Sequence, residues 1–433
     1  MIKIINPAEG TWEQILKRPT ATFQEIEVTA KSVFNEIQNK GDDAVCKYTS
    51  LFDGIVLQNY EVSAAEIQEA IALVSDELKE AIVLAKSNIE KFHKAQQTAK
   101  IEVETTDGVL CWQEKRPIQK VGLYIPGGNA PLFSTVLMLA VPANIARCRE
   151  VILCSPPNKQ GKINPAILFT ANLCGVTKIF KVGGIQAIAG MTFGTKSIPK
   201  VYKIFGPGNQ FVTVAKQLAT QYGVAIDMPA GPSELLIFAD DSANASFVAA
   251  DLLSQAEHGI DSQTILVSTS ITLIDAVEHA VTIQIQNLPK KDIALQSIQN
   301  SKLIFVENDA IALQLIDEYA PEHFIVCSKN EDYFINFIQN AGSTFIGNFT
   351  PESAGDYASG TNHTLPTNGY SKSYSGVNLD SFLKTMSFQK ISDKGILNIG
   401  KAIEIMADAE GLFAHKNAVT LRLKSLETER LIL

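Results

Sequence analysis

The hydrophobic pattern of the chain changes character near residue 120. Before that point, apolar residues recur at helical spacing, first in TFQEIEVTAKSVFNEIQNKG, which stops at Gly41, and again from Ser75 to about Lys94. From Lys120 onward, short apolar runs alternate with helical patterns: KVGLYIPGG, a helical stretch at 132–147, EVILCSPP, TKIFKVGG and KVYKIFGPGN. The pattern therefore predicts a helical N-terminal region followed by parallel strands that helices connect.

The alternation starts a second time after the segment IDMPAGPS. Four further strands are predicted, with helices between them: ELLIFAD, QTILVST, SKLIFVEN and HFIVCS. A stretch rich in Gly, Ser, Asn and Thr, SAGDYASGTNHTLPTNGYSKSYSG, then breaks the periodicity for more than twenty residues. An irregular stretch of that length inside a compact protein is usually functional. From about Lys394 to Leu423 the pattern is helical again.

Composition and charge narrow the class of protein. A chain of 433 residues is too long for one ordinary hydrophobic core, so two or more domains are expected. The net charge of −9 argues against nucleic acid or an anionic membrane as a partner. No apolar run approaches the roughly 20 residues of a membrane helix, and no secretory signal is expected at the start. The six scattered cysteines fit reduced thiols, which favours a cytoplasmic location.

Three predicted strands lead into glycine immediately before a helix. These loops are YIPGG, KVGGIQAIAG and FGPGN. Glycine allows a tight turn and lets main-chain N–H groups at a helix start approach an anion such as pyrophosphate. None of the loops matches the G-x-G-x-x-G fingerprint of dinucleotide sites, and any α/β protein needs some glycine turns. The loops therefore permit a dinucleotide site without proving one.

Four of the six histidines stand in unusual local sequences, and two of these belong to a possible metal site. His258 follows Gln255 by three residues, which would place both on one face of a helix that Gly259 ends. Convergence of Gln255, His258, Asp356 and His415 would give nitrogen and oxygen ligands that suit Zn²⁺ or Mn²⁺. Spacing alone leaves open that each residue caps a helix or holds a loop. His93 and His279 lie on helical patterns and are expected to be exposed or satisfied.

The segment YAPEHFIV places a carboxylate beside an imidazole at a predicted strand start. Glu322 and His323 form a sensible acid–base pair there, because histidine titrates near working pH. The alternative is a turn in which Pro321 fixes the backbone and both polar side chains face water.

Taken together, these segments resemble the histidinol dehydrogenase family. The matching stretches occur in the family's order from about residue 120 to 420: GLYIPGG, KVGGIQAIA, KIFGPGN, AIDMPAGPSE, LLSQAEHGIDSQ, APEH, SAGDYASGTNHTLPT and EGLFAHKNAV. The resemblance implies oxidation of L-histidinol through L-histidinaldehyde to L-histidine with two NAD⁺, the last step of histidine biosynthesis. It also implies an α/β fold of two incomplete Rossmann-like parallel-sheet domains with small helical N- and C-terminal units.

The resemblance assigns a role to each candidate residue. It implies one Zn²⁺ per subunit, bound by Gln255, His258, Asp356 and His415. Glu322 and His323 would be the acid–base residues, with His323 taking the hydroxyl proton first and Glu322 helping to activate water in the second half-reaction. The substrate contacts would come from the metal ligands together with His323 and three further residues, Ser233, His363 and Glu410. The NAD⁺ contacts would be Tyr124, Gln186 and Asn209.

The family also implies a homodimer whose C-terminal segment completes the partner's site. We expect an N-terminal helical arm over 1–20 and a larger α/β domain with the metal and catalytic residues over 21–120 together with 234–373. The NAD-binding domain is expected over 121–233 and the C-terminal helical unit over 374–433. The N-terminal helices are expected to pack with the larger domain.

The residues alone and the family resemblance differ on the role of the metal. From the residues alone, zinc would polarise the alcohol oxygen as a Lewis acid, whereas the family implies that the metal grips the substrate's imidazole and amine. A zinc hydrolase, a non-catalytic metabolite-binding protein and an enzyme for another amino alcohol are the rival functions. Cys327 lies in an apolar strand and is expected to be a core residue rather than a nucleophile.

Overall fold

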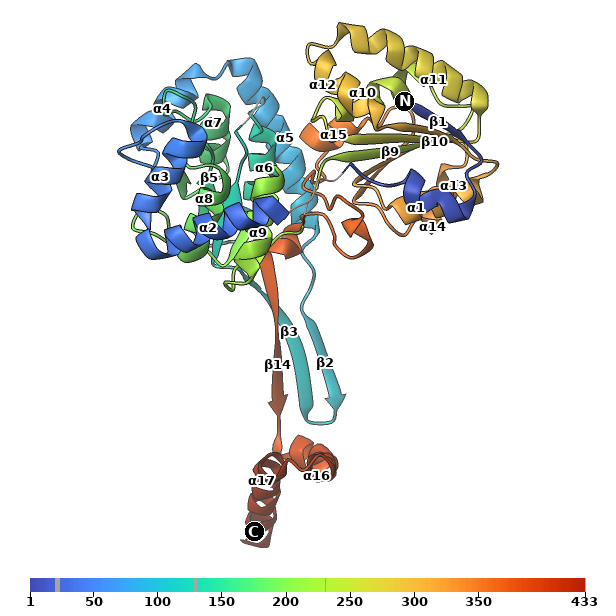
Figure 1. Ribbon diagram of the computed structural model, residues 1–433. Coiled ribbons are helices and arrows are strands. Elements are labelled where there is room, and N and C mark those ends of the chain that lie inside the picture. Colours follow the sequence, from blue (N-terminus) through green and yellow to red (C-terminus); the bar gives the residue numbers. More distant parts are fainter. Residues whose placement is uncertain (20–23, 128–130, 230, 433) are drawn as a thin grey trace. The chain divides into compact units, whose positions relative to one another are not determined.

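The computed structural model describes residues 1–19, 24–127, 131–229 and 231–432 (Figure 1). The chain divides into two compact units. Unit 1 comprises residues 1–96 and 118–382, and unit 2 comprises residues 97–117 and 383–433. Unit 1 contains two parallel sheets and unit 2 an antiparallel one. The expected α/β class with two parallel sheets is confirmed.

The first lobe of unit 1 is built on a five-stranded parallel sheet in the order β6-β5-β4-β7-β8. Its strands are β4 (Lys120–Tyr124), β5 (Glu150–Cys154), β6 (Lys178–Phe180), β7 (Lys203–Phe205) and β8 (Ala225–Ile226). The connecting helices are α6 (Phe133–Ile145), α7 (Pro165–Leu173), α8 (Gly184–Phe193) and α9 (Gln210–Thr220). The strand order reverses between β4 and β7, and such a switch point opens a crevice at the carboxyl ends of the strands.

The N-terminal helices cover this first lobe. They are α2 (Gln24–Lys40), α3 (Asp42–Asp53), α4 (Ala64–Leu73) and α5 (Asp76–Ala95). Phe34 and Val45 share one core with Ile188 and Leu218 of α8 and α9, and α4 and α5 pack on α7 and α6. The expectation that these helices pack with the larger domain is therefore wrong. Their apolar stripes pack on the crossover helices of the five-stranded sheet, α2 on α8 and α9, α4 on α7 and α5 on α6. Residues 20–23, at the start of the first predicted helix, lie outside the described residues.

The second lobe is built on a six-stranded parallel sheet in the order β1-β11-β10-β9-β12-β13. Its strands are β1 (Ile2–Ile5), β9 (Glu234–Ala239), β10 (Gln263–Ser268), β11 (Lys302–Phe305), β12 (His323–Cys327) and β13 (Ser343–Ile346). β9, β10 and β12 are buried along their whole length, as near-continuous apolar runs require.

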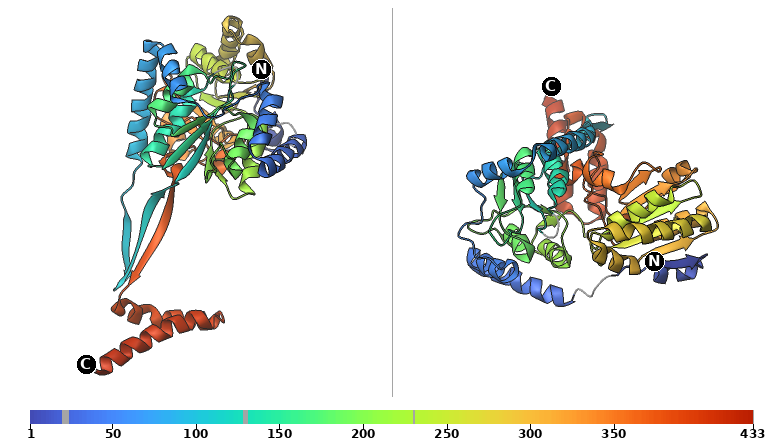
Figure 2. Two further views of the ribbon diagram at one scale, coloured as in Figure 1. Left: turned by 90° about the vertical axis from the view of Figure 1, so that its left-hand side faces the viewer. Right: turned by 90° about the horizontal axis from the view of Figure 1, so that it is seen from above.

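Helices cover both faces of the six-stranded sheet (Figures 1 and 2). One face carries α10 (Ala245–Ala256), α11 (Ile271–Gln284) and α12 (Lys291–Gln299). The other carries α1 (Trp12–Ile15), α13 (Asp309–Tyr319) and α14 (Glu331–Phe337). The short helix α15 (Glu352–Tyr357) opens the irregular stretch predicted from the sequence.

The first twenty residues are not a purely helical arm. Ile2–Ile5 form β1, which pairs in parallel with β11 at the edge of the six-stranded sheet. The short alternating run IKII was too close to the chain start to show a strand period, and the neighbouring strand supplies its hydrogen bonds. The N-terminal segment is therefore part of the second lobe.

Unit 2 also differs from the expected helical unit. It contains an antiparallel sheet of β2 (Ile101–Thr106), β3 (Val109–Pro117) and β14 (Leu383–Ile391), together with helices α16 (Asp393–Ala409) and α17 (Phe413–Ile432). The predicted C-terminal helix is present as these two helices. The strands were missed because β14 pairs with β3, about 270 residues earlier, a contact that local periodicity does not reveal. Within the described residues, no helix has the length and apolarity needed to span a membrane.

Candidate active site

A cavity of about 360 Å³ in unit 1 brings together half of the twelve predicted site residues. Six of them line it: Ser233, His258, Glu322, His323, Asp356 and His363. The catalytic candidates stand where strands of the second lobe begin, since Ser233 precedes β9 and His323 starts β12. Pro126 and Pro207 of the first lobe, each just after a strand, also line the cavity. The cavity thus lies between strand carboxyl ends of one lobe and strand amino ends of the other.

His323 is held by one ring nitrogen. Its Nδ1 lies 3.2 Å from the main-chain oxygen of Glu234, and its Nε2 is buried without a hydrogen-bond partner among the described residues. An Nδ1–H that donates to a carbonyl leaves Nε2 as the basic atom. Burial lowers the pKa of His323 to about 4, although the Asp356 carboxylate favours the charged form. The imidazole is therefore neutral near pH 7 and can accept a proton at Nε2.

Glu322 and His323 are buried rather than exposed in a turn. Glu322 Oε2 accepts a hydrogen bond of 2.8 Å from the main-chain N–H of Glu234. Burial raises the pKa of Glu322 well above its usual value, and the nearby carboxylates of Glu234 and Asp356 add to this. A carboxylate with a raised pKa is a stronger base, which suits proton transfer near neutral pH. The solvent-facing alternative for this pair is therefore excluded.

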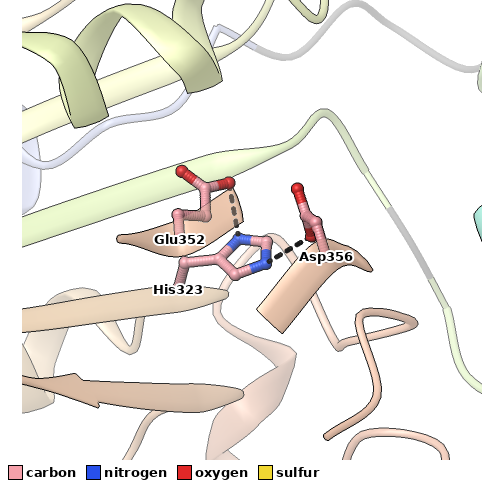
Figure 3. Close-up of side chains that lie close together, drawn as sticks. All are labelled: His323, Glu352 and Asp356. Atoms are coloured by element: carbon pink, nitrogen blue, oxygen red, sulfur yellow. Dashed lines mark ion pairs between the residues drawn. The ribbon is translucent and has the colours of Figure 1, made fainter. Parts of the chain in front are cut away.

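Two carboxylates of α15 flank the His323 ring, as Figure 3 shows. Glu352 Oε1 lies 3.5 Å from Nδ1 and Asp356 Oδ1 lies 3.9 Å from Nε2. The ligand atoms of these three residues lie within 4.8 Å of one another. Glu352 is buried, and burial together with Asp356 and Glu322 raises its pKa well above the usual value. Sequence reasoning missed Glu352, although its spacing of four residues from Asp356 places both on one helical face.

Gln255 and His258 stand at the carboxyl end of α10. Both side-chain amide atoms of Gln255 are buried without a hydrogen-bond partner among the described residues, an arrangement that is costly unless a ligand binds there. His258 lies in the turn after the helix, since α10 ends at Ala256, and not on the last helical turn as expected. His258 lowers the pKa of both His323 and His363, after the larger effect of their burial.

The nitrogen and oxygen donors around this cavity fit a divalent metal ion. The buried amide of Gln255, the imidazole of His258 and the carboxylate of Asp356 offer the ligand types that Zn²⁺ or Mn²⁺ accepts. His363 is fixed beside them, with Nδ1 2.9 Å from the main-chain oxygen of Asp356 and Nε2 3.1 Å from Thr135 Oγ1. The two remaining residues predicted to bind metal or substrate, Glu410 and His415, belong to unit 2, where both are exposed.

The predicted dinucleotide residues lie at the carboxyl edge of the five-stranded sheet. Tyr124 ends β4, and its hydroxyl accepts a hydrogen bond of 3.1 Å from the N–H of Gly184 at the start of α8. Asn209 caps α9 through a 3.1 Å hydrogen bond from the N–H of Val212, and it lines a second cavity of about 420 Å³ shared with Ser233 and His258. Gly128 of the YIPGG loop lies outside the described residues.

Near the carboxyl edge of this sheet, Gln186 Oε1 and Ser155 Oγ are buried without a hydrogen-bond partner among the described residues. The Gln186 amide donates to Asp53, and Asp53 and Ser155 line a further cavity of about 400 Å³. Unpaired polar groups beside helix starts fit a ligand that carries hydroxyl and phosphate groups.

The FGPGN loop is fixed by a buried ion pair. Lys216 and Asp227 approach to 2.5 Å; Lys216 also donates to the main-chain oxygen of Gly206, and Asp227 accepts from the Gly206 N–H. Gly206 has φ +124°, and a Cβ there would lie 2.0 Å from the main-chain oxygen of Tyr124. Only glycine lets this loop approach β4 so closely.

Comparison with known proteins identifies the family. A family model described as histidinol dehydrogenase matches residues 16–423. Histidinol dehydrogenase of Bacteroides thetaiotaomicron is 58% identical over 99% of this chain and 100% of the relative, and that of Escherichia coli is 49% identical over 96% of each. A crystal structure of histidinol dehydrogenase from Elizabethkingia anophelis has 55% identity and a TM-score of 0.96 over 99% of both chains. An acetylating aldehyde dehydrogenase from Geobacillus thermoglucosidasius, at 13% identity and a TM-score of 0.50 over 88% of this chain and 94% of that one, shares the fold alone. The chain therefore belongs to the histidinol dehydrogenase family and is an oxidoreductase.

Proposed function

We propose that the protein oxidises L-histidinol through L-histidinaldehyde to L-histidine, with two NAD⁺ and one Zn²⁺ per subunit, as the last step of histidine biosynthesis in the cytoplasm. The family supports the substrate and the cofactors. The observation that carries the chemistry is the buried, neutral His323, whose Nε2 has no hydrogen-bond partner in the described part of the chain and lies at a cavity of about 360 Å³.

Each residue has a role that its surroundings support. In the first half-reaction, Nε2 of His323 takes the hydroxyl proton as the hydride leaves the carbinol carbon. In the second, Glu322 takes a proton from the water that adds to the aldehyde carbon, and a second hydride then leaves. The sum is one alcohol, one water and two NAD⁺ giving one carboxylate, two NADH and three protons.

The metal ion and the dinucleotide would be held by residues around these cavities, among which Gln255 and Gln186 have buried side-chain atoms without a hydrogen-bond partner in the described part of the chain. Zn²⁺ would be bound by Gln255, His258 and Asp356, with His415 of a second subunit, and the dinucleotide by Tyr124, Gln186 and Asn209. When bound, zinc would fix the substrate's imidazole and amine, and NAD⁺ would accept the hydride at each oxidation. Ser233, His363 and Glu410 are the remaining proposed substrate contacts.

We also propose a homodimer with shared active sites. Unit 2 exposes many large apolar side chains, which a soluble monomer would not favour: Ile101, Val103, Met386, Ile391, Ile405, Met406, Leu412, Phe413 and Leu421. A second copy of the chain would cover them, and Glu410 and His415 would then act in the partner's site. The excess of acidic groups gives no support to a nucleic-acid partner.

The deciding experiment is the number of NADH formed per histidinol consumed, measured before and after a chelator removes metal. Two NADH per histidinol, lost with the metal and restored by zinc, is the expected result. One NADH or none in the zinc-loaded protein would overturn the proposal and direct attention to other amino alcohols or to hydrolysis.

A further inference from the structure

Arg18, in the N-terminal segment of the second lobe, pairs with Glu234 at the start of β9. Its Nε donates to Glu234 Oε1 at 2.5 Å, and its Nη2 donates to Glu234 Oε2 at 2.8 Å. The Glu234 side chain is 2% exposed and that of Arg18 is 16% exposed. A two-pronged pair between guanidinium and carboxylate fixes orientation as well as charge, which a lysine would not do. Glu234 is therefore locked at the position where β9 begins.

The same guanidinium also binds the segment that leads into β12. Arg18 Nη2 donates to the main-chain oxygen of Tyr319 at 2.6 Å, and the guanidinium carbon lies 4.1 Å from the centre of the Tyr319 ring. Tyr319 is fully buried, and only three residues separate it from His323. One side chain from the N-terminal segment thus ties the beginnings of two neighbouring strands together.

The residue held by Arg18 is the one that holds the acid–base pair. The main-chain N–H of Glu234 donates to Glu322 Oε2 at 2.8 Å, and its main-chain oxygen lies 3.2 Å from His323 Nδ1. Both polar main-chain groups of Glu234 are therefore used to orient Glu322 and His323. The Asn368 N–H donates to Glu234 Oε1 at 2.6 Å and holds the carboxylate from a third direction.

We propose that Arg18 is a positioning residue of the reaction, which acts through Glu234 to keep the His323 proton on Nδ1 and the base at Nε2. The inference rests on the proposed function for its catalytic consequence and on this geometry for its structural one. Displacement of Glu234 would remove the carbonyl that selects the Nδ1–H tautomer and the N–H that orients the Glu322 carboxylate. Arg18 is not one of the residues that line the cavity.

The main test compares R18K with wild type and with the control K17A. R18K keeps a cation near the buried carboxylate but loses the two-pronged hydrogen bond to it. Lys17 is a suitable control because it is exposed in the same segment, and it contacts Gln263 through its main-chain oxygen, which accepts a hydrogen bond from the Gln263 amide. In metal-free protein labelled with ¹⁵N-histidine, the ring nitrogens of His323 report the tautomer, with its signal assigned by its loss in H323Q. The expected result is Nδ1–H in wild type and K17A, and a mixture of tautomers in R18K.

A kinetic measurement tests the catalytic consequence. R18K should lower kcat by about ten- to a hundredfold, with KM for histidinol within about threefold of wild type, because misplacing a base by less than 1 Å costs rate more than binding. Millimolar guanidinium should restore part of the activity of R18A, and K17A should behave as wild type. An unchanged tautomer in R18K, or wild-type kcat in R18K, would overturn the proposal.

The two readouts separate the two proposals. The tautomer measurement needs no substrate, so it can confirm the link from Arg18 to His323 even if the protein formed no NADH from histidinol. Such a result would refute the proposed function alone. A lower Tm in R18K with an unchanged tautomer would assign Arg18 a role in stability only and would also overturn the inference.

Discussion

Gln186 Nε2 donates a 3.0 Å hydrogen bond to the carboxylate of Asp53, which joins α8 to the end of α3. Burial raises the pKa of Asp53 to about 6, despite the opposing effect of this hydrogen bond. The folded state therefore binds a proton at Asp53 more tightly than the unfolded state does. The sign follows from linkage: the contribution of Asp53 to stability is greatest below about pH 4 and is lost as the pH rises through about 6.

Replacement of Asp53 by Asn should therefore raise the Tm of the cofactor-free protein at pH 8 and change it little at pH 4. Asparagine keeps an oxygen that accepts from Gln186 and removes the buried charge. Differential scanning calorimetry across this range checks the effect, with Asp43→Asn, an exposed position on the same helix, as the control. A Tm difference that does not depend on pH would contradict the prediction.

Gln255→Leu should abolish stabilisation by zinc without destabilising the metal-free protein. The amide of Gln255 is buried and has no hydrogen-bond partner among the residues that the structure describes, so its removal costs no hydrogen bond seen there, while a bound metal would lose a ligand. Melting curves with a chelator and with added zinc measure both effects.

Gln263 is the matched control for that substitution, since it is also buried but fully engaged with Tyr319, Lys17 and Asn300. Gln263→Leu should lose about 1–3 kcal/mol of stability in both conditions and keep the zinc-induced rise. Retention of the full zinc response by Gln255→Leu would remove Gln255 from the metal site.

Glu322→Gln should separate the two oxidations. The amide cannot take a proton from water, so the second oxidation should slow by about 10²- to 10⁴-fold while the first persists. Single-turnover experiments should then give close to one NADH per histidinol instead of two. Glu257→Gln, at another acid lining the same cavity, should give two. Equal loss of both oxidations in Glu322→Gln would assign this residue a role in binding or in the first step.

Cys327→Ala should leave turnover largely intact. Burial raises the pKa of the Cys327 thiol to about 12, and its side chain packs among Leu235, Ile237 and other residues of the second lobe's core. A buried thiol with that pKa is a poor nucleophile, and its loss should cost about 1–2 kcal/mol of stability. Steady-state kinetics and denaturant unfolding measure the two quantities; near-complete loss of turnover in a folded variant would revive covalent aldehyde catalysis.

Phe413→Glu should produce an inactive monomer. Phe413 is 68% exposed at the start of α17, and a charge there would oppose burial against a second copy. Sedimentation velocity measures the mass, and mixing with His323→Gln subunits tests for shared sites. Val28→Glu, 70% exposed on α2 of unit 1, is the control and should remain dimeric. A fully active monomer would refute the shared active site.

The sequence predicted most of the parallel-sheet architecture because buried parallel strands are continuous apolar runs. ELLIFA and HFIVC became β9 and β12 within a residue or two of the expected bounds. The lobe on which the N-terminal helices pack could not be predicted from the sequence. An apolar stripe indicates that one face of a helix is buried, but it does not identify the surface that covers this face. β2, β3 and β14 were missed because most of their residues are exposed or half-exposed and their pairing spans most of the chain.

The candidate site was predicted where residues stand in distinctive local sequences, as with Glu322, His323 and Asp356. Arg18 and Glu352 were missed for a different reason. Their importance lies in contacts between segments far apart in the sequence, such as Arg18 with Glu234, 216 residues later. A single buried carboxylate or arginine carries no signal until folding brings its partner beside it.

β9 and β12 begin at the cavity, so their carboxyl ends lie on the far side of the six-stranded sheet from it. A strand of six residues is about 20 Å long, so the loops that follow β9, β10 and β12 lie roughly that far from the reacting atoms. The segments at 240–244, 269–270 and 328–330 are thus separated from the reacting atoms by the length of a strand. Peptide tags or surface-attachment groups inserted there would leave the active-site end of the lobe undisturbed, whereas in most parallel-sheet enzymes the corresponding loops form the active site.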